Sequence, residues 1–171
     1  MNLLTRLADD MRLMFRRPPR LQFGALCHRI NAETGAREIL LLTSRDTGRW
    51  VIPKGWPMAG KAAHEVAAQE ALEEAGVLGE VGADDVGYFD YRKMMKDGFA
   101  LDCRVKVYPL AFTDFVRKYK EKGQRKRRWF AFEEAARLVN EPMLKTLILA
   151  FGQANPPPGP ESSPPGAPPQ E

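Results

Sequence analysis

The stretch GWPMAGKAAHEVAAQEALEEAGV, residues 55–77, decides the fold because it contains the clearest helix signal of the chain. From Ala63 onward it is rich in alanine and lacks proline and glycine for about three turns. Gly76 then offers a C-terminal stop, since glycine readily adopts the left-handed conformation that ends many helices. The sequence therefore predicts a loop that starts at Gly55 and leads into a helix.

Three glutamates, Glu70, Glu73 and Glu74, share one face of this predicted helix. At about 100° per residue, their spacing of i, i+3 and i+4 gathers the carboxylates within about 100° of arc. Like charges so close repel one another, and a divalent cation would reverse that penalty, because carboxylate oxygens are ligands that magnesium prefers. An acidic, solvated face is the alternative interpretation. The residues on the opposite side, which we expect to meet a sheet, are Ala68, Leu72 and Ala75.

The loop also fits the spacing of a nucleotide-binding phosphate loop, reading G-W-P-M-A-G-K-A from Gly55, until its last position. That position needs a serine or threonine hydroxyl to hold magnesium, and Ala62 has none. Pro57 also removes one of the amides that would donate to phosphate. We therefore reject a nucleotide-binding phosphate loop.

The rest of the chain predicts short strands with few helices, and therefore an α+β fold with a mixed sheet. The turn NAETGA separates two apolar runs into one hairpin, and Asp97-Gly98 marks a second hairpin. The predicted strands are LQFGALCHRI (21–30), REILLLT (37–43), RWVIP (49–53), GYFDYRKM (87–94) and LDCRVKVYPLAFT (101–113). Helical apolar spacing predicts two further helices, FEEAARLV (132–139) and EPMLKTLILAF (141–151).

One domain, residues 21–152, accounts for these elements, since 171 residues with 44% hydrophobic content can bury one core. Residues 1–20 carry leucine and methionine at helical spacing, which predicts an amphipathic helix that packs on the domain or on a partner. A membrane-surface role for this helix is the alternative. Residues 153–171 are rich in proline and predict a disordered tail, with a proline-binding protein as a candidate partner.

The sequence predicts neither a membrane-spanning segment nor a signal peptide. No apolar run approaches the roughly 18 residues that span a bilayer, and charges interrupt the N-terminal segment, unlike the core of a signal peptide. Cys27 and Cys103 lie far apart without metal-ligand spacing. We therefore expect two reduced thiols in a cytoplasmic protein without membrane contact.

Positive charge gathers in KEKGQRKRRWF, residues 120–130, around the single acid Glu121. The cations are Lys120, Lys122, Arg125, Lys126, Arg127 and Arg128. Such a cluster suits a polyanion, either a multiply phosphorylated small molecule or, less favoured, a nucleic acid. An ordinary solvated loop is the alternative.

The loop and helix at residues 55–77 together resemble the Nudix box. Its pattern is Gly, five residues, Glu, seven residues, then Arg-Glu-U-x-Glu-Glu-x-Gly-U, in which U is aliphatic. The matching residues are Gly55, Glu70, Ala71, Glu73, Glu74, Gly76 and Val77, whereas Lys61 replaces the first Glu and Gln69 replaces the Arg. The segments SRDTGRWVIPKG, GALCHR, GYFDY and GQRKRRWF are most similar to those of diphosphoinositol polyphosphate phosphohydrolases and diadenosine polyphosphate hydrolases. The resemblance covers about residues 20–150.

This resemblance implies a Nudix fold, a mixed sheet sandwiched between helices (α/β/α). It also implies magnesium-dependent attack of water on a phosphoanhydride, with manganese as a substitute metal. The implied metal ligands are Glu70, Glu74 and the backbone carbonyl of Lys54, and we choose Glu73 as the base. The residues implied for binding substrate phosphates are Ser44, Arg45, Lys54, Arg125 and Lys126. Arginine suits this role because its planar fork donates two parallel hydrogen bonds to phosphate.

The two departures from the pattern remove a salt bridge that is thought to steady the loop in this family. Because Lys61 and Gln69 change together, no buried charge loses its partner, and we still expect activity. The predicted substrate is a diphosphoinositol polyphosphate or a diadenosine polyphosphate. Two alternatives stay open. One is a Nudix hydrolase of another diphosphate, such as an RNA 5′ end or ADP-ribose, and the other is a non-catalytic module that binds RNA or another polyanion.

Overall fold

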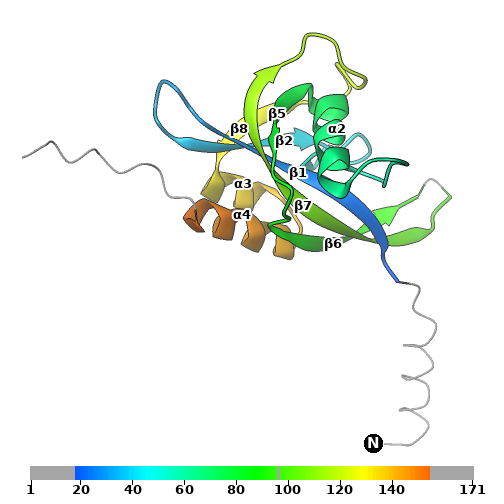
Figure 1. The fold of residues 1–171 in the computed structure, drawn as a ribbon. Helices are drawn as coiled ribbons and strands as arrows, with labels where there is room; N and C mark the ends of the chain where they lie inside the picture. Colours follow the sequence, from blue (N-terminus) through cyan, green and yellow to red (C-terminus); the bar gives the residue numbers. More distant parts are fainter. Residues whose placement is uncertain (1–17, 96, 155–171) are drawn as a thin grey trace, which may run out of the picture.

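A mixed eight-stranded sheet organises the described part of the chain, residues 18–95 and 97–154 of a computed structural model. Its strands are β1 (Arg20–Ile30), β2 (Arg37–Thr43), β3 (Trp50–Val51), β4 (Lys54–Gly55), β5 (Val77–Val81), β6 (Gly87–Met94), β7 (Ala100–Phe115) and β8 (Arg127–Ala131). The helices are α2 (Ala63–Ala75), α3 (Phe132–Leu138) and α4 (Pro142–Ala154). Helix α2 covers one face of the sheet, and α3 and α4 cover the other (Figure 1). The predicted α+β fold with its sheet between helices is confirmed.

Both hairpins that the turn signals predict are present. Strands β1 and β2 pair antiparallel, with Ile30 opposite Arg37 across the NAETGA turn. Strands β6 and β7 pair antiparallel up to Met94 opposite Ala100. The predicted short strand at RWVIP is present as β3, which pairs with the end of β2. The predicted helices also form, as α2, α3 and α4.

The sheet contains further pairings that the sequence did not predict. Strand β1 runs parallel to β7, from Arg20 opposite Cys103 to His28 opposite Ala111. Strand β5 pairs with β7, and β8 pairs with β2, both antiparallel. Because these partners are distant in sequence, no local turn signal reveals them. Strand β8, with the sequence RRWFA, includes the C-terminal part of the basic cluster. That part of the cluster is therefore built into the sheet.

The sheet divides the apolar core into two layers. One layer lies against α3 and α4, and the other lies beneath α2. In α2 the fully buried apolar residues are Val66, Ala67, Ala71 and Ala75, whereas Ala68 and Leu72 are only partly buried. Ala75 and Ala68 contact this layer as predicted, whereas the prediction was wrong at Leu72. The helix is rotated so that its buried stripe runs beside the acidic face, which brings Glu74 to 9% exposure.

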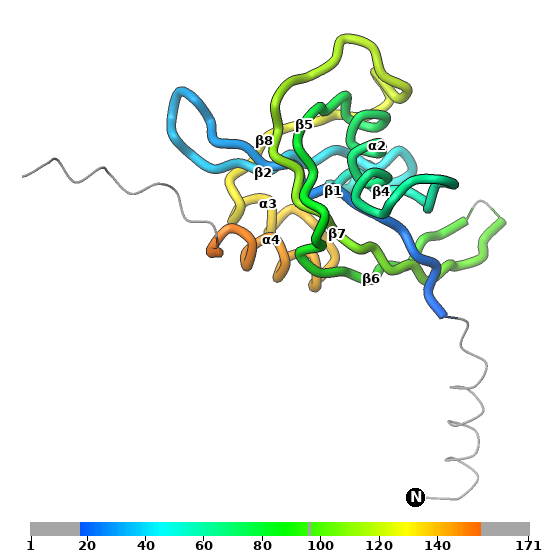
Figure 2. The backbone as a smooth tube through the Cα atoms, in the orientation of Figure 1, coloured from blue at the N-terminus to red at the C-terminus, as the bar shows by residue number. Residues whose placement is uncertain are grey.

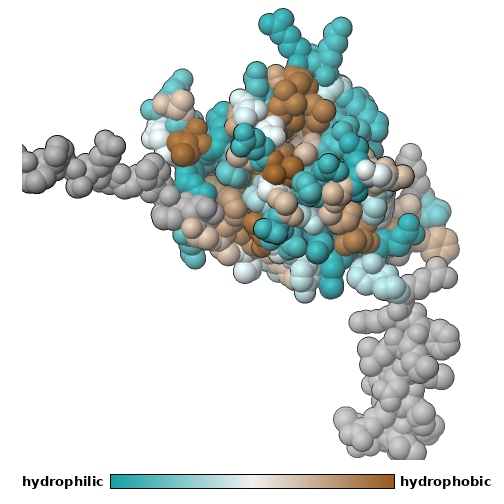
Figure 3. All heavy atoms as spheres, viewed as in Figure 1, coloured by the Kyte–Doolittle hydropathy of each residue, from teal (hydrophilic) through white to brown (hydrophobic). Residues whose placement is uncertain are grey.

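The C-terminal end of α2 is fixed by three backbone contacts. Gly76 adopts the left-handed conformation, with φ of 66°, and its amide donates to the carbonyl of Leu72 at 2.9 Å. Its own carbonyl accepts from Val116 at 2.9 Å, and Arg127 donates to the carbonyl of Ala75. These contacts hold the loop of residues 116–126, which follows β7, beside the end of α2 (Figure 2). Hydrophilic side chains alternate with hydrophobic patches over the face seen in Figure 3, and one such patch lies near its top.

Three predictions concern the ends and the environment of the chain. The predicted helix at 1–20 and the predicted tail at 153–171 fall almost entirely outside the described residues. Cys27 and Cys103 are both buried and unpaired, which confirms the expected free thiols. Among the described residues, no helix has the length and apolar content needed to cross a membrane.

We predict that Gly76→Ala destabilises the protein more than Gly123→Ala does. Both glycines have positive φ, so alanine costs about 1–2 kcal/mol at either position. At Gly76 the added Cβ would also come within 2.5 Å of the Tyr119 ring, whereas at Gly123 nothing lies within 4 Å. Urea denaturation of both variants measures the difference. Equal losses would show that the packing of Tyr119 on Gly76 contributes nothing.

Candidate active site

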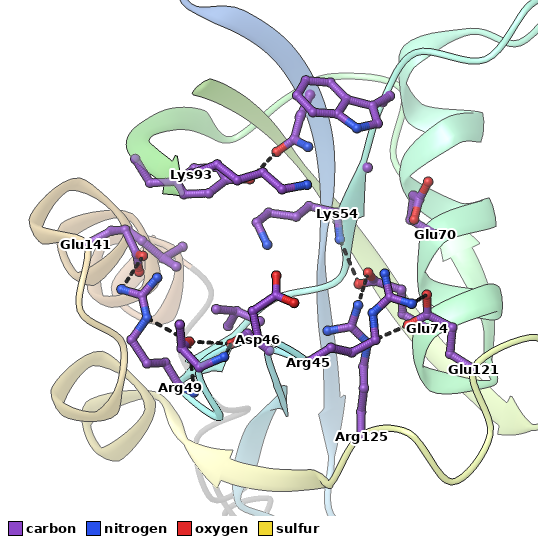
Figure 4. Close-up of a pocket in the computed structure, with 18 of the residues that line it drawn as sticks. Arg45, Asp46, Arg49, Lys54, Glu70, Glu74, Lys93, Glu121, Arg125 and Glu141 are labelled. Atoms are coloured by element: carbon purple, nitrogen blue, oxygen red, sulfur yellow. Dashed lines mark hydrogen bonds and ion pairs between the residues drawn. The ribbon is translucent and has the colours of Figure 1, made fainter. Parts of the chain in front are cut away.

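A pocket of about 380 Å³ gathers most of the residues that the sequence singled out. Its lining includes Glu70, Glu73 and Glu74 of α2 and four of the predicted phosphate-binding residues, namely Ser44, Arg45, Lys54 and Arg125 (Figure 4). Lys126 is exposed and does not line the pocket. Its backbone amide instead donates to Thr43 Oγ1 at 3.0 Å, which ties the start of β8 to β2.

Glu70 lies against the backbone of Gly55, at the floor of the pocket. A Cβ on Gly55 would collide with the Glu70 carboxylate, so only glycine leaves room for this approach. No hydrogen bond or ion pair reaches the Glu70 side chain from any described residue. Burial raises the pKa of Glu70 to about 7, and the neighbouring charges of Glu74 and Glu73 add to this rise. The site therefore contains a carboxylate without a cation partner, close to two other negative charges.

Glu74 is held between the loop and a buried arginine. Its Oε2 accepts the backbone N–H of Lys54 at 3.2 Å, and its Oε1 accepts Arg125 Nη2 at 2.6 Å. Burial raises the pKa of Glu74, although Arg125 and Lys54 oppose the rise. Arg125 also donates to Glu121 at 2.6 Å and to the carbonyl of Thr43 at 3.1 Å. The guanidinium thus bridges α2, the loop before β8 and the end of β2.

Glu73 faces two donors at the more open side of α2. Lys120 Nζ donates to Oε2 at 2.7 Å, and Gln69 Nε2 donates to Oε1 at 2.9 Å. These hydrogen bonds, that of Lys120 first, lower the pKa of Glu73. Gln69 therefore still contacts the acidic trio from the position where the family pattern has arginine. Lys61 is exposed, and its amide donates to the carbonyl of Met58 at 3.2 Å within the loop.

The donor chemistry of the trio fits a hard divalent cation. In residues 18–95 and 97–154, no three His, Cys, Asp or Glu side chains are already arranged to hold a metal ion. The reason is that Glu73 and Glu74 are each turned onto a cation, Lys120 and Arg125. Glu70 remains unpaired, and Glu74 touches the backbone of Lys54. A magnesium ion that replaced the contact of Arg125 would therefore find carboxylate oxygens on one side of the pocket.

Several pocket residues were not found by sequence reasoning. Lys93 lies 5.5 Å from the ring centroid of Trp56, and Lys54 Nζ lies 5.1 Å from that of Tyr91. Glu141 lines the opposite wall, where its Oε1 is 3.6 Å from Arg49 Nη1. These residues come from separate strands, a loop and the turn before α4, so only the folded sheet brings them together.

Two arginines of the basic cluster, Arg125 and Arg127, bind inside the protein, whereas its lysines lie at the surface. Arg125 and Lys120 pair with carboxylates of α2, as described above. The Arg127 guanidinium lies 3.8 Å from the centroid of the Phe115 ring and also caps α2. Lys120, Lys122, Lys126 and Arg128 are exposed. A continuous polyanion-binding strip of all six cations is therefore not present.

Comparison with known proteins places the chain in a family. No family model matches it. The chain is 29% identical over 123 residues to Nudix hydrolase 16, mitochondrial, of Arabidopsis thaliana, covering 70% of this chain and 68% of that protein. It is 31% identical over 119 residues to human diphosphoinositol polyphosphate phosphohydrolase 3-beta, covering 68% and 66%. The chain belongs to the Nudix hydrolase superfamily.

Not all Nudix relatives are matched over the same share of their length. The chain spans only 56% to 59% of the Arabidopsis Nudix hydrolases 12, 21, 4 and 13.

Solved structures support the Nudix fold. The Caenorhabditis elegans Ap4A hydrolase is 20% identical with a TM-score of 0.56, and the match covers 80% of this chain and 98% of that chain. The Nudix domain of Shewanella oneidensis NrtR, solved with ADP ribose, is 12% identical with a TM-score of 0.59, covering 91% and 100%.

We predict that Glu70→Gln stabilises the metal-free protein at pH 8 and has little effect at pH 5. The folded pKa of about 7 exceeds the unfolded value of 4.5, so the folded state holds a proton that the unfolded chain loses. The free energy of unfolding therefore falls as pH rises from about 4.5 to 7, and stays low above it. The gain at pH 8 is about 1–2 kcal/mol, reduced by solvent screening of this half-buried group.

Chemical denaturation in EDTA at the two pH values measures this effect. Glu80→Gln, exposed on β5, is the control and should change stability equally at both. Adding magnesium at pH 8 should favour the wild type over Glu70→Gln, because a ligand stabilises the state that binds it. A variant that is less stable than the wild type in EDTA at pH 8 would contradict this account of Glu70.

Proposed function

We propose that this protein is a magnesium-dependent hydrolase that cleaves a phosphoanhydride bond in a multiply phosphorylated small molecule. The observation that carries the proposal is the placement of Glu70 and Glu74 against the Lys54–Gly55 backbone, at the floor of a pocket. Membership of the Nudix hydrolase superfamily, whose curated relatives are named as hydrolases, supports hydrolysis of an acid anhydride as the reaction.

The three glutamates take different roles in this proposal. Glu70 and Glu74 bind the metal together with the backbone carbonyl of Lys54, because both side chains lie at the pocket floor beside that backbone, where a cation would offset their negative charge. Bound magnesium, or manganese in its place, supplies charge neutralisation and lowers the pKa of an attacking water. Glu73 accepts the proton from that water. Its lowered pKa keeps it ionised, and its side chain is 23% exposed, within reach of solvent.

Substrate phosphates are bound by the cationic side of the pocket. Ser44 and Arg45 contribute from the turn after β2, and Lys54 from β4. Arg125 binds a substrate phosphate after a metal ion replaces its contact with Glu74. The exposed Lys126 binds phosphate only if the substrate extends beyond the pocket. The names of two similar proteins, a diphosphoinositol polyphosphate phosphohydrolase and an Ap4A hydrolase, support a polyphosphate as substrate. The cytoplasmic location and the partner of the proline-rich tail stay predictions from the sequence.

A non-catalytic polyanion-binding module is the less supported function. Two cations of the basic cluster, Arg125 and Arg127, are engaged inside the protein, and the exposed Lys120 pairs with Glu73. The exposed remainder is a small patch, which suits nucleic acid less well than a continuous basic stripe would.

We predict magnesium-dependent turnover of at least one compound in a panel of diphosphoinositol polyphosphates, diadenosine polyphosphates, ADP-ribose and 5′-triphosphorylated RNA. EDTA should abolish it. Glu70→Gln and Glu74→Gln should each lower kcat/KM by about 10²-fold or more, since each removes a metal-binding carboxylate. Glu73→Gln should lower kcat with little change in metal affinity, since a base contributes typically 10²- to 10⁴-fold.

Controls separate chemistry from folding. Glu80→Gln removes a carboxylate from the exposed face of β5 and should retain wild-type kcat/KM. Product analysis by phosphorus NMR identifies which anhydride is cleaved. If binding of the polyanions persists in EDTA, weakens steeply with salt and leads to no cleavage, the binding-module function replaces the enzyme.

A further inference from the structure

Glu141 is a buried carboxylate that lacks a hydrogen-bond donor on one oxygen. The residue is 8% exposed, and its Oε2 makes no hydrogen bond with any described residue. Its Oε1 lies 3.6 Å from Arg49 Nη1, which is longer than a hydrogen bond. A buried polar group without a partner is unfavourable, so an acceptor left open in a pocket wall is a site where a ligand donor would bind.

The backbone fixes the position of this carboxylate. Glu141 immediately precedes α4, and its carbonyl accepts the amide of Lys145 at 3.0 Å. The side chain lies across the pocket from Glu70 and Glu74, with Lys54 and Lys93 between them (Figure 4). If the diphosphate is cleaved at α2, then the part of the substrate that does not react extends towards Glu141.

The charge balance of the pocket limits how many phosphates it can hold. Most of its arginines and lysines already lie beside carboxylates: Arg125 beside Glu74 and Glu121, Arg45 beside Glu121, Lys120 beside Glu73, Arg92 beside Asp102, and Arg49 beside Glu141. Within the described part of the chain, Lys54 and Lys93 have no carboxylate partner for their ammonium groups. A densely phosphorylated ring would therefore place phosphate near Glu141 without enough free cations to offset the repulsion.

We propose that Glu141 is a specificity-determining residue, which accepts a hydrogen bond from a hydroxyl or amino group on the part of the substrate beside the diphosphate. It thereby selects substrates that keep such a donor, such as a sugar or a base, over a polyol phosphorylated at every position. The inference rests on the proposed function, because it takes the α2 side of the pocket as the place of reaction. The aromatic rings of Trp56 and Tyr91 line the same pocket and offer apolar surface to such a group.

The test compares kcat/KM for ADP-ribose, which carries hydroxyl and amino donors, with kcat/KM for diphosphoinositol pentakisphosphate, which has no free hydroxyl. The wild type should prefer ADP-ribose. Glu141→Lys should shift the ratio towards the inositol compound by about tenfold or more, because it replaces repulsion of phosphate by attraction. Glu80→Lys makes the same change of charge on the exposed face of β5 and should leave the ratio unchanged.

Two further measurements keep the test decisive. If Glu141→Lys does not fold, Glu141→Gln, which keeps the shape but removes the charge, should still shift the ratio by about threefold or more. The rise in melting temperature caused by α,β-methylene ADP-ribose, which is not cleaved, reports binding independently of turnover. Loss of that rise in Glu141→Lys, with no substrate cleaved by the wild type, would support the inference while the proposed function fails.

Two results would overturn the inference. One is a wild-type preference for diphosphoinositol pentakisphosphate over ADP-ribose. The other is an equal shift of the ratio in Glu141→Lys and Glu80→Lys, which would assign the effect to overall charge.

Discussion

The buried guanidinium of Arg125 joins the parts of the molecule on which the pocket depends. It donates to Glu74 and Glu121, both at 2.6 Å, and to the carbonyl of Thr43 at 3.1 Å. The three charged side chains are 8% to 12% exposed, so loss of Arg125 would leave Glu74 without a cation partner and Glu121 with Arg45 alone, at a cost of about 3–5 kcal/mol. The pairing therefore holds α2, the loop before β8 and the end of β2 together, although negative charge is concentrated there.

Protein cations neutralise part of the acidic face of α2, and Arg125 is one of them. Arg125 and Lys120 neutralise Glu74 and Glu73, whereas Glu70 has no such partner and its pKa rises to about 7. A divalent cation completes this balance at Glu70 and competes with Arg125 for Glu74. On the far wall, Glu141 lies beside Arg49, but its Oε2 lacks a hydrogen bond near the residues that would meet the rest of a substrate. In this account, the α2 wall of the pocket carries out the reaction, and the Glu141 wall selects the substrate.

Local signals in the sequence predicted the hairpins, α2 and its trio of glutamates. They missed β5 and β8, because VLGEV is short and contains glycine, and RRWFA lies within a basic run. The parallel pairing of β1 with β7 arises only from tertiary packing. The buried face of α2 was predicted partly wrongly, because the small Ala71 packs inward while the larger Leu72 is only partly buried. Glu141 gave no signal, because an acid before a helix proline is typical of any helix start.

The most direct test of the magnesium site is a crystal structure grown with manganese, with the ion located by its anomalous scattering. We expect an ion bound by the carboxylates of Glu70 and Glu74 and by the carbonyl of Lys54, with the Arg125 guanidinium moved away from Glu74. A structure in which Arg125 still pairs with Glu74, and manganese binds elsewhere or not at all at saturating concentration, would contradict the account.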